Sequence, residues 1–129
     1  MTEYVIDYKK NGHGIRVEKV SGKLKVMKDG KVLADSRNAM ILEEDGLPPV
    51  YYIPISDVKE GILELTNRKS TCQYKGLASY YSIRTDGGKE ENKAWRYADP
   101  TAEFDQIRDY VAFYPLSRRG RVRLETGIA

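Results

Sequence analysis

Cysteine, histidine and long apolar runs are scarce in this chain, and each scarcity excludes a class of protein. With one cysteine, Cys72, no internal disulfide can form, and a reduced, cytoplasmic setting is the simplest expectation. No apolar run is long enough to cross a bilayer, so no membrane partner is expected. The first ten residues mix acidic and basic side chains without an apolar core, which is not the pattern of a signal peptide.

The same scarcity argues against a metal centre. A structural zinc site usually takes four Cys or His ligands, and this chain offers one of each, Cys72 and His13. No EF-hand spacing, phosphate-binding glycine loop or serine nucleophile elbow is present. We therefore expect no metal and no cofactor.

Positive charge is confined to the C-terminal segment. The formal net charge is +3, and residues 116–129 supply all of it through four arginines set against one glutamate. The remainder of the chain has no basic bias, so no nucleic-acid partner is indicated for the folded core. The sequence predicts three parts: a flexible N-terminal arm over residues 1–14, a single β-rich domain over 15–115 and a basic tail over 116–129.

Short alternating segments separated by turn residues favour β-strands. Leu24 and Val26 alternate with lysines, and Asp29-Gly30 then gives a strong hairpin signal. Further strands are predicted at residues 15–20, 32–34, 40–42, 50–55, 72–74, 78–84, 94–97 and 112–114. One helix is predicted near the C-terminus, opened by Asp99-Pro100 and carrying an apolar stripe of Phe104, Ile107 and Tyr110 or Val111.

Tyrosine is unusually frequent, with ten residues against two phenylalanines and one tryptophan. A tyrosine ring is apolar and its hydroxyl is polar, which suits a wall that is dry behind and wet in front. Plain strand packing is the alternative, and alternation places only about half of these rings on one face. The predicted ligand-binding residues are Tyr51, Tyr74, Tyr80, Trp95, Tyr97 and Arg37, with Tyr80, Trp95 and Tyr97 expected on one lining surface.

Cys72 and Lys75 form the most suggestive pair for catalysis. A nearby ammonium favours the thiolate, provided that Gly76 bends the chain, since positions three apart on a strand face opposite sides. Asp57 or Glu43 would assist. The alternative is a small buried thiol that packs like an apolar residue. For Arg37, the alternatives are a surface residue in an Asx-type turn and a contact to an anionic ligand or carboxylate.

Several segments, taken in order, resemble the domain-of-unknown-function family four-two-seven, which also carries a nucleotidyltransferase-like label. The resemblance covers about residues 15–115 and rests on residues 34–37, 48–54, 57–58, 72–80, 94–97 and 111–114. It implies a β-tent-like fold, in which two antiparallel sheets enclose a pocket that in related proteins binds nucleosides, cyclic imides or RNA ends. The carboxylate arrangement that nucleotidyl transfer needs to hold its metals is not found.

The resulting prediction is a mainly β fold of two antiparallel sheets with one short helix near the C-terminus. The first functional hypothesis is a small-molecule binding domain with an aromatic and polar pocket between the sheets. The second is a cysteine-dependent enzyme that uses Cys72, Lys75 and Asp57, and the third is an interaction module acting through the basic tail. The sequence does not determine the ligand or the oligomeric state.

Overall fold

β-Strands make up most of the described chain. The computed structural model describes residues 4–114 and, for the course of the backbone alone, residues 120–125. The strands are β1 (Ile6–Lys10), β2 (His13–Lys19), β3 (Lys23–Lys28), β4 (Lys31–Ser36), β5 (Met40–Glu44), β6 (Val50–Pro54), β7 (Leu63–Cys72), β8 (Gly76–Thr85), β9 (Gly88–Pro100), β10 (Tyr110–Phe113) and β11 (Gly120–Glu125). Two short 3-10 helices, η1 (Ile55–Asp57) and η2 (Ala102–Ile107), lie between them.

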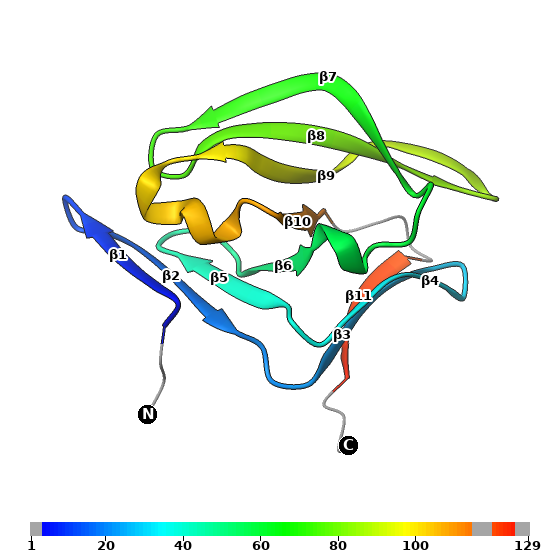
Figure 1. The fold of residues 1–129 in the computed structure, drawn as a ribbon, viewed down its shortest axis with the longest axis horizontal. Helices are drawn as coiled ribbons and strands as arrows, with labels where there is room; N and C mark the ends of the chain where they lie inside the picture. The colour runs from blue at the N-terminus through cyan, green and yellow to red at the C-terminus, as the bar shows by residue number, and fades with distance from the viewer. Residues whose placement is uncertain (1–3, 115–119, 126–129) are drawn as a thin grey trace.

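The strands form two antiparallel sheets, as the sequence predicted. The larger has eight strands in the order β1-β2-β5-β6-β10-β9-β8-β7, and the smaller has three in the order β11-β3-β4 (Figure 1). The eight-stranded sheet curves strongly, with β7, β8 and β9 above and β1, β2 and β5 below, and η2 lies between these two arms (Figure 1).

Turn chemistry sets the first two hairpins. Asp29 and Gly30 have φ of 52° and 77°, the positive values that a type I′ turn requires, and they join β3 to β4. Asn11 and Gly12 have φ of 52° and 81° and join β1 to β2 in the same way. The expected flexible arm is therefore a paired hairpin from residue 6 onward, because Asn-Gly is a turn signal as well as a flexible dipeptide.

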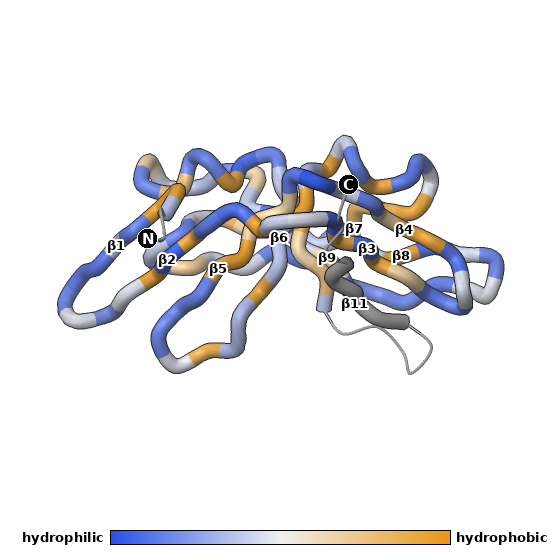
Figure 2. The backbone as a smooth tube through the Cα atoms, turned by 90° about the horizontal axis from the view of Figure 1, so that it is seen from below, coloured by the Kyte–Doolittle hydropathy of each residue, from blue (hydrophilic) through white to orange (hydrophobic). Residues whose placement is uncertain are grey.

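Two apolar cores cover opposite faces of the eight-stranded sheet. Alternation along each strand separates them, so that Tyr52 of β6 enters the first core and its neighbour Ile53 enters the second. The first core includes Phe104 and Ile107 of η2, and the second joins the large sheet to Leu24 of β3 and other residues of the small sheet. Figure 2 shows β1, β2 and β5 toward one end of the long axis and β3, β4 and β8 toward the other.

The predicted helix is present in a shorter form. Asp99 and Pro100 end strand β9, and the 3-10 helix η2 follows from Ala102 to Ile107. Phe104 has non-helical backbone angles within it, while Tyr110 already belongs to β10. The apolar spacing correctly predicted that Phe104 and Ile107 face the core, where both are fully buried. The helix ends at Ile107, so the part of the spacing that continued to Tyr110 or Val111 belongs to a strand instead.

No helix in the described ranges has both the length and the apolar character needed to cross a bilayer.

The C-terminal segment also contributes to the fold. Residues 120–125 form β11, which pairs with β3 from Gly120↔Lys28 to Glu125↔Lys23. The prediction that 116–129 is only a tail does not hold for these residues, because their backbone completes one edge of the small sheet. The remaining residues of that segment, 116–119 and 126–129, lie outside the described ranges.

Candidate functional site

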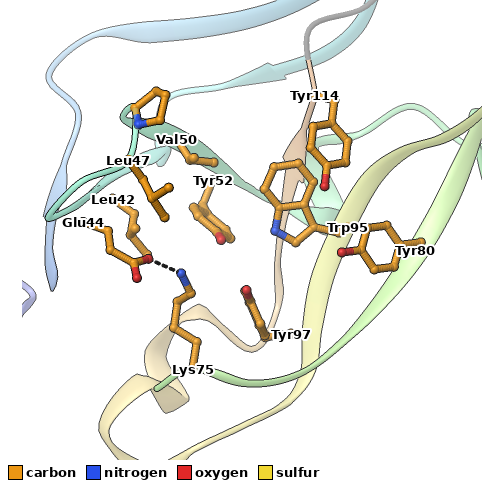
Figure 3. Close-up of a pocket in the computed structure, with 11 residues that line it drawn as sticks. Leu42, Glu44, Leu47, Val50, Tyr52, Lys75, Tyr80, Trp95, Tyr97 and Tyr114 are labelled. Carbon is orange, nitrogen blue, oxygen red and sulfur yellow. Dashed lines mark hydrogen bonds and ion pairs between the residues drawn. The ribbon is translucent and has the colours of Figure 1, made fainter. Parts of the chain in front are cut away.

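A cavity of about 190 Å³ opens on the face of the large sheet that carries the first core. Strands β5, β6, β8 and β9 supply most of its wall, and the loops after β5, β7 and β10 supply the remainder. Figure 3 shows its lining residues: Leu42, Glu44, Leu47, Pro48, Val50, Tyr52, Lys75, Tyr80, Trp95, Tyr97 and Tyr114. None of them belongs to β3 or β4, so the cavity does not lie between the two sheets as the sequence-based hypothesis had it.

Strand register gathers the aromatic rings. Tyr80 of β8 and Trp95 of β9 are direct partners across the ladder. Ala112 of β10 pairs with Trp95 on one side and with Tyr52 of β6 on the other. Because Ala112 has only a methyl side chain, the two large rings meet edge to face above it, with centroids 6.4 Å apart. Tyr114 adds a further ring, whose centroid lies 4.3 Å from that of Trp95.

A buried ion pair lies at the opposite end of the cavity. Lys75 Nζ donates to Glu44 Oε1 at 2.5 Å, and the two side chains are only 8% and 7% exposed (Figure 3). His13 Nε2 lies 2.8 Å from the other carboxylate oxygen and donates to it, since an ionised carboxylate only accepts. Burial alone would raise the pKa of Glu44, but the hydrogen bonds from Lys75 and His13 outweigh burial and lower that pKa. Glu44 is therefore a carboxylate at neutral pH.

The turn between β7 and β8 holds Lys75 in place. Gly76 has φ of +112°, and a Cβ there would lie 2.5 Å from the carbonyl oxygen of Asp99, so only glycine fits. Thr101 fastens the turn from the other side: its backbone N–H donates to Lys75 O at 2.9 Å, and its hydroxyl donates to Tyr74 O at 2.7 Å. From this fixed backbone the Lys75 side chain extends into the cavity (Figure 3).

Tyrosine hydroxyls stand between the ion pair and the rings. The Tyr97 hydroxyl points into the cavity toward Lys75, whose ammonium lies 5.7 Å from the centre of the Tyr97 ring (Figure 3). Burial raises the pKa of Tyr97 and of Tyr52, so both stay protonated at neutral pH. The cavity thus presents neutral hydroxyls and an ammonium beside an aromatic wall.

Four of the sequence-predicted residues meet in this lining, namely Lys75, Tyr80, Trp95 and Tyr97. Tyr74 is not part of the lining; its ring is stacked on that of His13, with the two centroids 4.6 Å apart. Tyr51 packs against the second core, and Arg37 is exposed beyond the end of β4. Asp57 lies in η1, where it accepts a hydrogen bond from the Ser36 hydroxyl at 2.6 Å.

Cys72 contacts Lys75, but not through the ammonium. Its sulfur accepts the backbone N–H of Lys75 at 3.4 Å, and the side chain packs, partly buried, against the first core. The Lys75 ammonium is directed to Glu44 instead. The contacts of these residues therefore do not show the thiolate-stabilising pair that the spacing suggested.

Sequence reasoning missed Glu44 and Tyr52 by one position each, having weighed Glu43 and Tyr51. A signal for both was present. Glu44 follows Met40 and Leu42 at a spacing of two, so it shares their buried face. The register Met40↔Tyr52 then puts Tyr52 on that face as well.

Within the described ranges, no group of three or more His, Cys, Asp or Glu side chains is arranged to hold a metal ion.

Residues 16–125 match the family model described as Domain of unknown function (DUF427), labelled NTP_transf_9. The matched range covers most of the chain. No curated protein matches it.

Proposed function

The chain belongs to the DUF427 family, whose description names no activity, and we propose that it binds a small molecule in the cavity described above. The observation that supports this proposal is the Glu44–Lys75 pair at the cavity wall. A buried ion pair contributes little net stability compared with apolar residues of similar size. Its position beside an open, aromatic-walled cavity is better explained by recognition of a polar ligand.

The hydrogen-bonding capacity of the cavity indicates what the ligand presents. Both oxygens of Glu44 already accept hydrogen bonds, from Lys75 and His13. An ammonium has three donors, so Lys75 retains donors beyond the one directed to Glu44, and the Tyr97 hydroxyl adds another. A ligand that fits therefore offers oxygen or nitrogen acceptors to Lys75 and a flat ring to Trp95.

The volume limits the ligand to a small molecule. The cavity holds about 190 Å³, and a closed apolar cavity of roughly 150 Å³ accepts benzene. A single ring with one or two polar substituents fits, with part of the molecule reaching the mouth beside Leu47, which is 60% exposed.

The two alternative functions make different demands. A cysteine-dependent enzyme needs a reactive Cys72, and an interaction module needs the C-terminal segment but not the cavity. The Lys75 contacts favour the binding function, because the ammonium serves Glu44 in the cavity. We also place the protein in the cytoplasm, on the ground that its single cysteine permits no internal disulfide.

Trp95 is the only tryptophan of the chain and lines the cavity, so its fluorescence reports occupancy directly. Benzoate, benzamide and similar single-ring compounds would be titrated at millimolar concentration while tryptophan emission is followed. We expect a saturable change with at least one ring compound. A response that is absent for every ring compound, or that does not saturate, would contradict the proposal.

A pair of tyrosine variants then assigns the site. Tyr97→Leu removes a ring and a hydroxyl from the cavity, whereas Tyr51→Leu makes the same change at a tyrosine that packs against the other core. Both keep Trp95 as the reporter. We expect Tyr97→Leu to weaken binding about tenfold, since a ring contact and a hydrogen bond each contribute about 0.5–1.5 kcal/mol. Equal losses in both variants would mean that the response comes from general destabilisation.

A further inference from the structure

Strand β7 is irregular opposite the aromatic wall. Leu65 pairs with Tyr81 and Lys69 pairs with Ser79, so the three intervening residues, 66–68, face the single residue Tyr80. This is an extended β-bulge, a feature that bends the strand and redirects a side chain. Here it belongs to the strand that borders the cavity-lining strand β8.

The bulge is built by specific hydrogen bonds. The Thr66 hydroxyl donates to Asn92 Oδ1 at 2.6 Å, and the backbone N–H of Arg68 donates to Thr66 Oγ1 at 3.2 Å. Asn92 itself has a positive φ of 53° and lies in a second irregularity, on β9. The irregular strands β7 and β9, which flank β8, are thus joined by a hydrogen bond between two side chains. Because Thr66 Oγ1 also accepts the Arg68 N–H, this link fixes the path of the backbone at Arg68.

The consequence is the position of the Arg68 side chain. Its guanidinium carbon lies 4.7 Å from the centre of the Tyr80 ring, in a cation–π contact with a residue that lines the cavity. The hydroxyl oxygen of Tyr80 is 2.8 Å from Oγ of Ser70, which lies on β7 like Arg68. Arg68 is not itself a lining residue, and its contact with Tyr80 is what brings the exposed arginine next to the cavity wall.

Electrostatics agree with this position. Burial and the Tyr80 hydroxyl raise the pKa of Tyr114 at the mouth, and the charge of Arg68 opposes that rise, so the guanidinium acts on both aromatic residues of this side. Arg68 forms no ion pair with a carboxylate of the described residues, unlike Arg84, which pairs with Glu64 at 2.6 Å, or Arg108, which pairs with Asp105 at 2.7 Å. Toward the side chains that the structure describes, its guanidinium donates no hydrogen bond.

We propose that Arg68 is a specificity residue of the cavity and binds an oxyanion group, carboxylate or phosphate, carried by a ring-shaped ligand. This inference rests on the proposed function and narrows its ligand class. The ring lies against Trp95, and the oxyanion extends past Tyr80 to Arg68, whose guanidinium offers two parallel hydrogen bonds. Neutral rings of the same size also enter the cavity, but they bind more weakly.

The test uses the full chain and three probes that share a phenyl ring. Benzoate and phenyl phosphate carry the oxyanion, and benzamide is the neutral counterpart of benzoate; Trp95 fluorescence measures all three affinities at neutral pH. Arg68→Gln removes the guanidinium and keeps a polar side chain. Lys69→Gln is the matched control, since it removes one positive charge from the next residue, whose ammonium is directed to Ser79 at 3.3 Å.

We expect Arg68→Gln to weaken an oxyanion probe about tenfold, as loss of a charge-assisted hydrogen bond does, and to leave benzamide within about twofold. Lys69→Gln should change neither by more than about twofold. Preferential loss of phenyl phosphate would identify a phosphate ligand, and preferential loss of benzoate a carboxylate.

Two results would overturn the inference in different ways. If Arg68→Gln weakens benzoate and phenyl phosphate no more than it weakens benzamide, Arg68 has no role in specificity, while the proposed binding function stands. If no probe changes Trp95 fluorescence in the unmodified chain, the binding function fails and the inference fails with it.

Discussion

Lys75→Met is the sharpest perturbation of the candidate site. It replaces the ammonium with an apolar side chain of similar length and leaves the Glu44 carboxylate, 7% exposed, with His13 as its remaining partner. Removing one member of a buried pair typically costs about 3–5 kcal/mol, because the other charge stays buried without compensation. His13 and the opening of the cavity reduce this cost, so we expect about 3 kcal/mol.

Thermal and urea unfolding measure the effect. For a domain of this size, about 3 kcal/mol corresponds to a fall in Tm of roughly 10 °C. The double variant Glu44→Leu with Lys75→Met removes both charges and should be more stable than Lys75→Met alone, since no orphaned carboxylate remains. Glu44→Leu alone completes the cycle by leaving the ammonium without its partner.

The pH dependence gives an independent check. Although burial opposes it, the Lys75 and His13 hydrogen bonds hold the pKa of Glu44 below its ordinary value of 4.5. A lowered pKa contributes stability that is present above that ordinary value and is lost as the pH falls through the folded value. The difference in unfolding free energy between the unmodified chain and Lys75→Met should therefore become smaller in acid, below about pH 4.5. Our interpretation is refuted if the thermal and urea midpoints of Lys75→Met equal those of the unmodified chain. It is also refuted if the loss of unfolding free energy is the same at all pH values.

Two further predictions follow from the strand assignments and from the thiol. Truncation after residue 115 removes β11 and leaves the pairing edge of β3 open, so we expect differential scanning calorimetry to show a Tm lower by about 5 °C or more; an unchanged Tm would mean that β11 is dispensable. Cys72→Ser should change the affinity for the ring probes by less than about twofold, because the sulfur contacts the backbone N–H of Lys75 while the Lys75 ammonium binds Glu44. A loss of affinity of tenfold or more would instead favour the cysteine-dependent function.

Period-two patterning accounts for most of what the sequence predicted correctly. The mainly β architecture, the Asp29-Gly30 hairpin and the shared face of Trp95 and Tyr97 all follow from alternation and turn chemistry. Tyr51 and Glu43 were named without applying this rule, whereas the structure uses Tyr52 and Glu44. A shift of one residue moves a side chain to the opposite face of a sheet.

Long-range register was outside the reach of sequence reasoning. Glu44 and Lys75 are 31 residues apart, and the contact exists because β5 and the β7–β8 turn lie across the same cavity. The placement of the cavity on the η2 face of the large sheet also depends on the strand order β6-β10-β9, which inserts a late strand beside an early one. Local patterns carry no information about such an order.

The charged residues named in the two proposals all come from places where regular alternation ends. Glu44 is the last residue of β5, Lys75 lies in the turn fixed by Gly76, and Arg68 lies in the β7 bulge. The aromatic wall, in contrast, is mostly built from regular cross-strand partners such as Tyr80 and Trp95. Regular strands can repeat a ring-lined surface at low cost in strain, but they cannot direct charged groups toward one point, because their side chains leave the sheet in parallel. A turn and a strand end bring an ammonium and a carboxylate to the cavity from different directions, and a bulge brings a guanidinium to the Tyr80 ring at its wall.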